Sequence, residues 1–425
     1  MSLRSEAAQA RAALAAAWAT LPEALRGPTQ FLGRQYAGCG ATIGIMPRCD
    51  FTCRGCYLGT EANRSRPVGL DAAREQLRAL RAWLGPGGNL QLTDGEVTLR
   101  AESEVIELIR EARAIGLVPM LMTHGETFRR KPGLLERLMT EGGLTEVSFH
   151  VDATMRGRRD GHAPSTSESE LADLRGEFAA MIRTARRRTG RRLDAASTVT
   201  VTRERLHEVP GIVRWFLRNA DAFKMVSFQP LAAVGRTDRA LAGVGARELW
   251  SAIAAGAALR DGDVERVAGA LGHPSCSRFV QGLVSRNGER FVPLYHADRD
   301  DEMTALHELL DRLGGTSFRL DDAGRRAARA ALLVARHGTF LLRRVLPHLV
   351  RRLREVGTIR PRYFCIVSHH FMSAAELATP LGRERLDTCA FRVPIDGRLE
   401  SMCAVNALGL RDAVYRAATP HAGAA

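Results

Sequence analysis

Short apolar runs alternate with longer amphipathic stretches along the first half of the sequence. The apolar runs lie at 41–46, 89–93, 118–123, 146–151, 197–202 and 224–229, and helical patterns lie between them near 70–83, 102–115, 132–141, 167–188 and 204–219. This alternation is typical of βα units around a parallel sheet, whose active residues gather at the C-terminal ends of the strands. Six units are too few for a closed eight-stranded barrel. We therefore expect an α/β fold with an open, partial (β/α)6 TIM-like barrel.

The alternation divides the chain into three segments. Residues 1–37 are rich in alanine and predict an N-terminal helical segment. Residues 38–240 form the predicted barrel. The regular pattern stops near residue 240, and residues 241–425 predict a mostly helical, cysteine-bearing C-terminal module around the barrel mouth.

Composition limits the classes of partner. The net charge of +14 is nearly all arginine, because lysine occurs only at Lys131 and Lys224. High-GC coding produces such a bias without selection for polyanions, so we expect a solvated basic surface and no specific nucleic-acid partner. No apolar run is long enough to span a bilayer, and the N-terminus lacks the apolar core of a signal peptide, which predicts a cytoplasmic protein. Eight cysteines in such a protein favour metal binding or redox chemistry over disulfides.

Three cysteines follow the first predicted strand. Cys49, Cys53 and Cys56 have the spacing C-x3-C-x2-C. Three thiolates on one short loop can ligate three irons of a cubane cluster, and the fourth iron stays open to a small molecule with an amine and a carboxylate. The alternative is a zinc site with a fourth ligand elsewhere, although zinc loops usually carry paired C-x2-C units.

The cysteine spacing resembles the motif of the radical S-adenosylmethionine (SAM) superfamily. The resemblance implies a [4Fe-4S] cluster whose open iron binds SAM, which is cleaved to methionine and a 5′-deoxyadenosyl radical that abstracts hydrogen. Asp94, Gly95 and Glu96 follow the second predicted strand and resemble the motif that binds the methionine amine in that superfamily, since a carboxylate accepts hydrogen bonds from an ammonium. The superfamily's aromatic residue before the third cysteine is here Gly55, and Tyr57 follows the cysteine as the candidate adenine contact.

Further polar residues follow the later strands. We expect these side chains to face the barrel mouth and to contact cofactor or substrate, although each alone could equally be a satisfied loop residue. His150 and Asp152 are two positions apart on one strand face and are the strongest candidates for binding ribose or substrate. The set is His124, His150, Asp152, Ser197 and Gln229.

Four cysteines lie beyond the predicted barrel, and each alone is more often a small buried hydrophobe than a ligand. The phrases HPSC at 273–276, HHFM at 369–372 and the stretch 386–406 resemble the tetraether lipid synthases and their radical SAM relatives, which couple alkyl chains at unactivated carbons. That resemblance implies an auxiliary iron–sulfur cluster with Cys276, Cys389 and Cys403 as ligands. Cys365 is included because a fourth ligand is wanted, and Cys39 is interpreted as structural.

Three functions follow as hypotheses. The first is radical chemistry on an aliphatic small-molecule or lipid substrate, forming or modifying a carbon–carbon bond; the second is maturation of a ribosomal peptide; the third is a non-enzymatic iron–sulfur or zinc protein. Either enzyme needs an electron donor such as a reductase, flavodoxin or ferredoxin. The basic amphipathic stretch 340–357, interrupted at Pro347, could rest on an anionic membrane at its inner face, although ordinary core packing with a basic outer face is the better explanation of this pattern.

Overall fold

The computed structural model describes residues 3–158, 167–260 and 262–417. Each of the six predicted apolar runs forms a strand, and these strands are parallel and adjacent in chain order. They are β1 (Gly40–Met46), β2 (Asn89–Asp94), β3 (Val118–Thr123), β4 (Glu146–His150), β5 (Asp194–Val201) and β6 (Phe223–Pro230). The fold is therefore mixed α/β with a curled half-barrel sheet.

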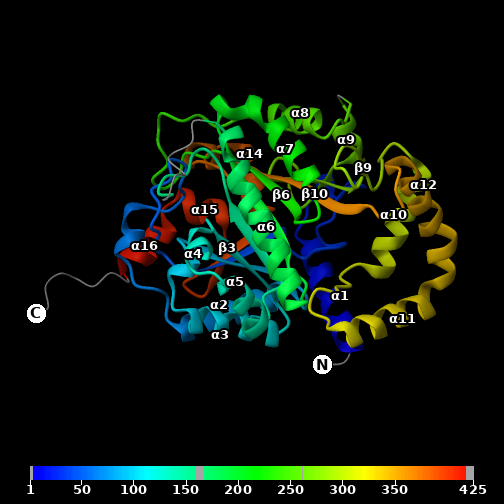
Figure 1. The fold of residues 1–425 in the computed structure, drawn as a ribbon, viewed down its shortest axis with the longest axis horizontal. Coiled ribbons are helices and arrows are strands. Elements are labelled where there is room, and N and C mark those ends of the chain that lie inside the picture. The colour runs from blue at the N-terminus through cyan, green and yellow to red at the C-terminus, as the bar shows by residue number, and fades with distance from the viewer. Residues whose placement is uncertain (1–2, 159–166, 261, 418–425) are drawn as a thin grey trace, which may run out of the picture.

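Amphipathic helices connect these strands and pack on the sheet (Figure 1). Helix α2 buries Ala73, Leu77, Leu80 and Leu84, which lie on one face at helical spacing. The connecting helices are α2 (Leu70–Leu84), α3 (Glu102–Ala114), α4 (Glu126–Arg130), α5 (Leu134–Arg137), α6 (Ala172–Thr189) and α7 (Val209–Arg218). The main apolar core lies between them and the strands.

The region after residue 240 contributes strands to both edges of the same sheet. Strand β10 (Arg362–His369) pairs parallel with β6, and β11 (Phe391–Ile395) pairs parallel with β1. Strands β7 (Gly269–Ala270), β8 (Ser277–Val284), β9 (Phe291–Pro293) and β12 (Arg398–Ser401) are antiparallel additions. The sequence predicted a mostly helical region here. The runs that form β8 and β10 are largely buried apolar segments, and periodicity alone does not separate such strands from buried helices.

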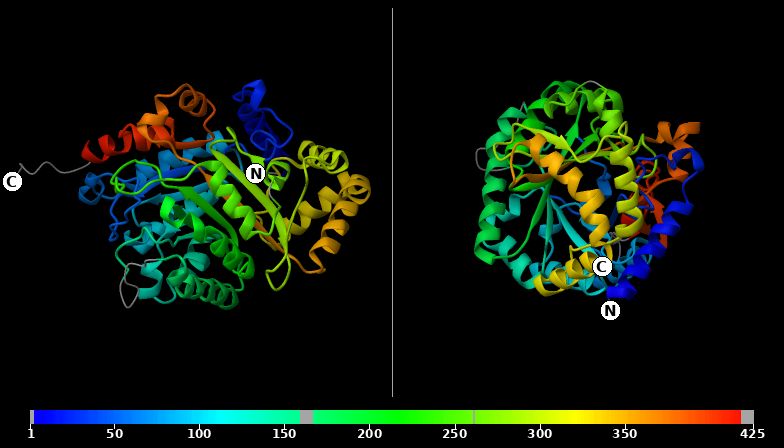
Figure 2. Two further views of the ribbon diagram at one scale, coloured as in Figure 1. Left: turned by 90° about the horizontal axis from the view of Figure 1, so that it is seen from above. Right: turned by 90° about the vertical axis from the view of Figure 1, so that its right-hand side faces the viewer.

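The remaining helices surround the sheet. They are α1 (Leu3–Ala19), α8 (Ala246–Gly256), α9 (Asp263–Val267), α10 (Asp300–Leu313), α11 (Ala323–Phe340), α12 (Leu346–Val356), α13 (Ala374–Leu377), α14 (Pro380–Asp387), α15 (Met402–Ala407) and α16 (Leu410–Ala417). Figure 2 shows α11 and α12, in yellow and orange, at the end of the molecule opposite α16. A π-helical turn joins α11 to α12, and Pro347 lies in the first turn of α12. No helix in the described ranges is long and apolar enough to cross a membrane.

Candidate active site

A cavity lies where the six parallel strands end. Parallel strands bring their carboxyl ends to one edge of a sheet, so loops far apart in sequence meet there. The cavity wall includes most of the residues that the sequence singled out: Cys49, Cys53, Cys56, Tyr57, Asp94, Gly95, Glu96, His124, His150 and Gln229. Phe371, Phe391 and Met402 from the C-terminal region form an apolar part of the same wall.

The end of β2 holds the beginning of the cysteine loop. The backbone N–H groups of Gly95 and Glu96 donate to the carbonyls of Met46, at 2.7 Å, and Arg48, at 2.8 Å. A Cβ atom on Gly95 would lie 2.1 Å from the Arg48 carbonyl oxygen, so this close approach requires glycine. The Asp94–Glu96 motif therefore positions the cysteine loop through its backbone.

The middle of the cysteine loop is held from the other side of the cavity. Thr52 and Arg54 donate their backbone N–H groups to the carbonyls of Arg156, at 2.9 Å, and Thr154, at 2.8 Å. The Arg54 side chain also forms a salt bridge of 2.9 Å with Asp238, in the loop that follows β6. Three neighbouring loops thus fix the segment that carries the thiols.

The three thiols of this loop are partly enclosed. Burial raises the pKa of Cys53 to about 12 and raises that of Cys49 further, so both thiols are protonated until a metal displaces the proton. Among the described residues, the three sulfur atoms are not all within 4.8 Å of one another. Thiolates on one tetrahedral Zn²⁺ would lie within about 4 Å of each other. Three thiols on one loop can ligate three irons of a cubane cluster and leave the fourth iron open.

Cys49, Asp50 and His124 each have one potential ligand atom within 4.8 Å of those of the other two. Asp50 is already engaged, because its carboxylate lies 2.8 Å from His124 Nε2 and accepts a 3.0 Å hydrogen bond from Arg130. His124 Nδ1 accepts from the backbone N–H of Glu126 at 3.1 Å. A metal ion bound by these three residues would have to break these hydrogen bonds.

The side chain of Asp94 is bound by the C-terminal helix. Its carboxylate accepts hydrogen bonds from Arg411 and Tyr415 of α16, and its backbone has a positive φ of 98°. Tyr57 donates its hydroxyl to the Asp94 carbonyl at 3.0 Å, and Arg411 lies over the Tyr57 ring at 5.3 Å. Burial raises the pKa of Tyr57 above its usual range, so this hydroxyl remains a donor. No local sequence pattern indicates a role for Arg411 or Tyr415 at this site.

Glu96 is buried, and its carboxylate is used within the protein. It accepts hydrogen bonds from the backbone and hydroxyl of Thr98, from the hydroxyl of Thr123 at 2.7 Å and from the backbone N–H of His124 at 2.9 Å. These contacts tie the end of β3 to the end of β2. The side chain that the sequence assigned to the methionine amine therefore fixes two loops at the cavity wall.

His150 and Asp152 form a pair at the end of β4. His150 Nε2 lies 2.7 Å from the Asp152 carboxylate, which also accepts backbone N–H groups from Thr154 and Thr200, each at 2.8 Å. Burial alone would raise the pKa of Asp152, but His150 and these donors outweigh it and lower the pKa. His150 faces the cavity while Asp152 lies buried behind it. Asp152 thus orients His150.

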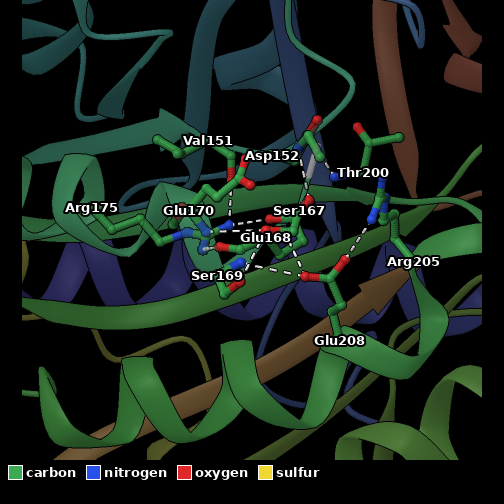
Figure 3. A network of polar contacts seen from close by, with 12 residues as sticks. Val151, Asp152, Ser167, Glu168, Ser169, Glu170, Arg175, Thr200, Arg205 and Glu208 are labelled. Carbon is green, nitrogen blue, oxygen red and sulfur yellow. Dashed lines mark hydrogen bonds and ion pairs between the residues drawn. The ribbon is translucent and has the colours of Figure 1, made fainter. Parts of the chain in front are cut away.

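A buried ion pair anchors the loop after this pair (Figure 3). Glu168 pairs with Arg175 and accepts the backbone N–H of Ala153 at 2.7 Å. Arg175 also donates to the Val151 carbonyl at 3.1 Å, and Glu208 accepts the backbone N–H of Glu168 at 2.6 Å. The network connects the ends of β4 and β5 to helix α6, which holds His150 and Asp152 in place.

The remaining strand-end candidates differ in position. Ser197 is fully buried and donates its hydroxyl to the Phe149 carbonyl at 2.9 Å, so it joins two strands. Gln229 lines the cavity, as does Thr198. The structure therefore brings Gln229, but not the Ser197 hydroxyl, to the cavity wall.

The four predicted C-terminal ligands do not all meet. Cys276 precedes β8, Cys389 precedes β11, and Cys403 lies in the first turn of α15, whereas Cys365 lies within β10. Ser277, the residue after Cys276, pairs with His369 of β10. His369 is four positions along β10 from Cys365. Four strand residues span about 13 Å. Cys365 packs in a separate apolar cluster with Phe31 and Tyr295.

Comparisons with known proteins match parts of this chain. No family model matches it. A curated relative, 7,8-dihydro-6-hydroxymethylpterin dimethyltransferase from Methanocaldococcus jannaschii, is 25% identical over 205 residues, which are 47% of this chain and 37% of that protein. The chain thus spans little more than a third of the length of the relative.

Solved structures resemble the fold weakly. SuiB from Streptococcus suis is 11% identical with a TM-score of 0.36, covering 50% of this chain and 44% of its own. The enzyme anSMEcpe with bound AdoMet (SAM) is 14% identical with a TM-score of 0.32, covering 44% and 50%. Coproporphyrinogen III oxidase (HemN) from Escherichia coli, a radical SAM enzyme, is 12% identical with a TM-score of 0.32, covering 97% and 93%.

Proposed function

We propose that this chain is a radical SAM enzyme that acts on an aliphatic, lipid-like substrate to form or modify a carbon–carbon bond. The observation that carries the proposal is the position of the three motif thiols. Cys49, Cys53 and Cys56 line one cavity at the strand ends, together with Gly95 and Glu96 at the end of β2. In this proposal β1 to β6 form a (β/α)6 partial barrel that β10 and β11 extend.

The residues of the cavity fit the proposed cofactors. Cys49, Cys53 and Cys56 would hold a [4Fe-4S] cluster, and the end of β2 at Gly95 would meet the methionine part of SAM. His150, oriented by Asp152, presents an imidazole to the cavity that suits a ribose hydroxyl or a substrate. When bound, cluster and SAM supply electron transfer and hydrogen abstraction. The protein supplies binding, orientation and an enclosed wall.

The apolar wall supports the choice of an aliphatic substrate. Phe371, Phe391 and Met402 line the cavity and pack in one apolar cluster with Tyr57, and Met155 and Leu231 are further apolar residues of the cavity wall. Ligand sites for alkyl groups need such surfaces, with polar groups confined to the ends of the ligand. A peptide substrate would instead need partners for its backbone hydrogen bonds.

Helices α11 and α12 support contact with an anionic membrane surface. Leu332, Leu342, Leu346 and Leu349 are exposed there, and the segment also carries exposed arginines such as Arg343. Apolar side chains beside cations are typical of helices that rest in a lipid interface. Changing Leu342 and Leu349 to glutamate should weaken binding to phosphatidylglycerol vesicles and leave phosphatidylcholine vesicles unbound, as sedimentation can measure.

A substrate screen tests the proposal. Reduced protein with SAM is incubated with a lipid extract or with candidate peptides, and 5′-deoxyadenosine is measured by mass spectrometry. Dithionite replaces the proposed reductase, flavodoxin or ferredoxin. We expect lipid to increase 5′-deoxyadenosine and a lipid product to lose hydrogen or gain carbon. Stimulation by peptide alone would contradict the aliphatic substrate and favour a peptide maturase.

Methyl transfer is a second candidate, because the curated relative is named a dimethyltransferase of a pterin. The same assay separates the two functions when S-adenosylhomocysteine is measured beside 5′-deoxyadenosine. A reduced hydroxymethylpterin added as substrate should leave both products unchanged if the substrate is aliphatic. Formation of a methylated pterin would favour the second candidate.

A further inference from the structure

Cys39 lies with three of the C-terminal cysteines. It directly precedes β1, and its backbone N–H donates to the carbonyl of Ala390 at 2.8 Å, next to Cys389. The register of β1 and β11 opposes Gly40 to Phe391. A Cβ atom on Gly40 would lie 2.4 Å from the Phe391 ring, so glycine permits the close approach that brings Cys39 to Cys389.

Cys276 and Cys403 come from two other segments of the chain and lie near Cys39 and Cys389. Cys403 Sγ accepts the backbone N–H of Met372 at 3.4 Å, and the Cys276 carbonyl accepts that of His370 at 2.8 Å, so both lie against the loop after β10. Phe371, which lies between His370 and Met372 in this loop, packs in the same apolar cluster as Cys39 and Cys389. This cluster joins the two pairs of cysteines.

A buried cation at this place indicates an anionic partner. Arg385 is 7% exposed, and its Nε donates to Cys276 Sγ at 3.1 Å, while Nη2 donates to the His370 carbonyl at 2.7 Å. Among the described residues, Arg385 forms no salt bridge with a carboxylate. A buried guanidinium is costly without a compensating negative charge. Thiolate ligands of a metal cluster supply that charge.

The four sulfurs are not grouped as they would be around one bound ion. Among the described residues, no three of these four sulfur atoms lie within 4.8 Å of one another. Four thiolates on one tetrahedral ion would lie within about 4 Å. A [4Fe-4S] cluster takes four cysteine thiolates, one on each iron, and holds them further apart than a single ion does.

We propose that Cys39, Cys276, Cys389 and Cys403 form a complete four-cysteine site for a second [4Fe-4S] cluster with no open iron. This inference rests on the proposed function and replaces Cys365 with Cys39 as the fourth ligand. A cluster whose irons all carry protein thiolates cannot bind SAM or substrate through iron. Its role is electron transfer and the joining of four chain segments.

The proposed site borders the candidate active site. Cys39 and Cys389 pack against Phe391 and Met402, and these two side chains also line the cavity. One layer of apolar side chains therefore separates the four-cysteine site from the cavity. A cluster here is close enough to exchange electrons with a molecule in the cavity without contacting it.

The test isolates the second cluster by replacing Cys49, Cys53 and Cys56 with alanine. That protein should hold about four irons per chain, and adding Cys39→Ser should remove iron or convert the EPR spectrum to that of a three-iron cluster. Cys365→Ser, added to the same background, is the matched control and should change neither. Loss of iron with Cys365→Ser but not with Cys39→Ser, or no loss with either, would overturn the proposal, as would finding zinc.

Two further measurements keep the test decisive. Circular dichroism of each variant separates loss of a ligand from loss of the fold. Arg385→Gln should shift the reduction potential of the remaining cluster while iron content stays constant.

Adding SAM to the isolated second cluster should leave its EPR spectrum unchanged. A changed spectrum would show an open iron and overturn the proposal. In the complementary protein, which lacks the four cysteines, SAM should alter the spectrum; no change there would count against the proposed function instead.

Discussion

The two cysteine sites differ in how the chain builds them. Cys49, Cys53 and Cys56 come from one loop after β1, and neighbouring loops hold that loop mainly by backbone hydrogen bonds. Cys39, Cys276, Cys389 and Cys403 come from four segments that meet only because β11 pairs with β1 and β8 pairs with β10. The first site can form when one loop is ordered. The second depends on the complete sheet, so metal binding there is coupled to global folding.

Removal of the first site should have the strongest effect of all, on iron content. Alanine at Cys49, Cys53 and Cys56 should reduce the iron content from about eight to about four per chain, because each cubane holds four irons. The far-ultraviolet circular dichroism should be retained, since the loop is held by backbone groups. Iron and sulfide analysis of anaerobically purified protein checks the count. Unchanged iron would remove these cysteines from any cluster.

A substitution in α16 tests how far the first site depends on residues that are distant in the sequence. Arg411→Ala leaves the buried Asp94 carboxylate without its guanidinium, which should lower the free energy of unfolding by about 3–5 kcal/mol. It should also loosen the end of β2 and weaken SAM binding. Arg416→Ala, at an exposed position of the same helix, is the control. Urea denaturation of both variants measures the difference; equal stabilities would mean that the first site is independent of α16.

A smaller effect concerns Glu96. Glu96→Ala leaves the donors of Thr98, Thr123 and His124 unpaired, which should cost about 1–3 kcal/mol of stability and weaken SAM binding by roughly tenfold. Glu75→Ala, at an exposed position on α2, should change neither. Equilibrium dialysis with SAM and thermal unfolding measure both quantities. Unchanged SAM affinity would remove Glu96 from the support of the site.

The last effect depends on pH. The pKa of Asp152 is lowered in the folded protein, so the stability that it contributes is complete above the unfolded value of about 3.9 and is lost as pH falls through the folded value. Asp152→Asn should therefore be less stable than the wild type at pH 7, by roughly 1–3 kcal/mol. This difference should shrink below about pH 4. A difference independent of pH would contradict the charged pair with His150.

The contrast between the sites also explains what the sequence could predict. The six strands and the first cysteine loop follow from local periodicity and spacing, and both are found where expected. The sequence around Cys39 and around Cys365 does not show whether either cysteine is a metal ligand or a buried core residue. Only the pairing of β11 with β1 brings Cys39 to Cys389, and only the register of β8 and β10 keeps Cys365 apart. Asp94 shows the same limit, because its partners Arg411 and Tyr415 follow more than 300 residues later.

SAM cleavage by the reduced protein is the decisive measurement for the first cysteine site. Dithionite-reduced wild-type protein is given SAM without substrate, and 5′-deoxyadenosine and methionine are measured over time. We expect slow formation of both in equal amounts, none with alanine at Cys49, Cys53 and Cys56, and cleavage that persists in Cys365→Ser. Equal cleavage by the triple variant, or no cleavage by a wild-type protein that holds its full iron, would contradict the assignment of the first site.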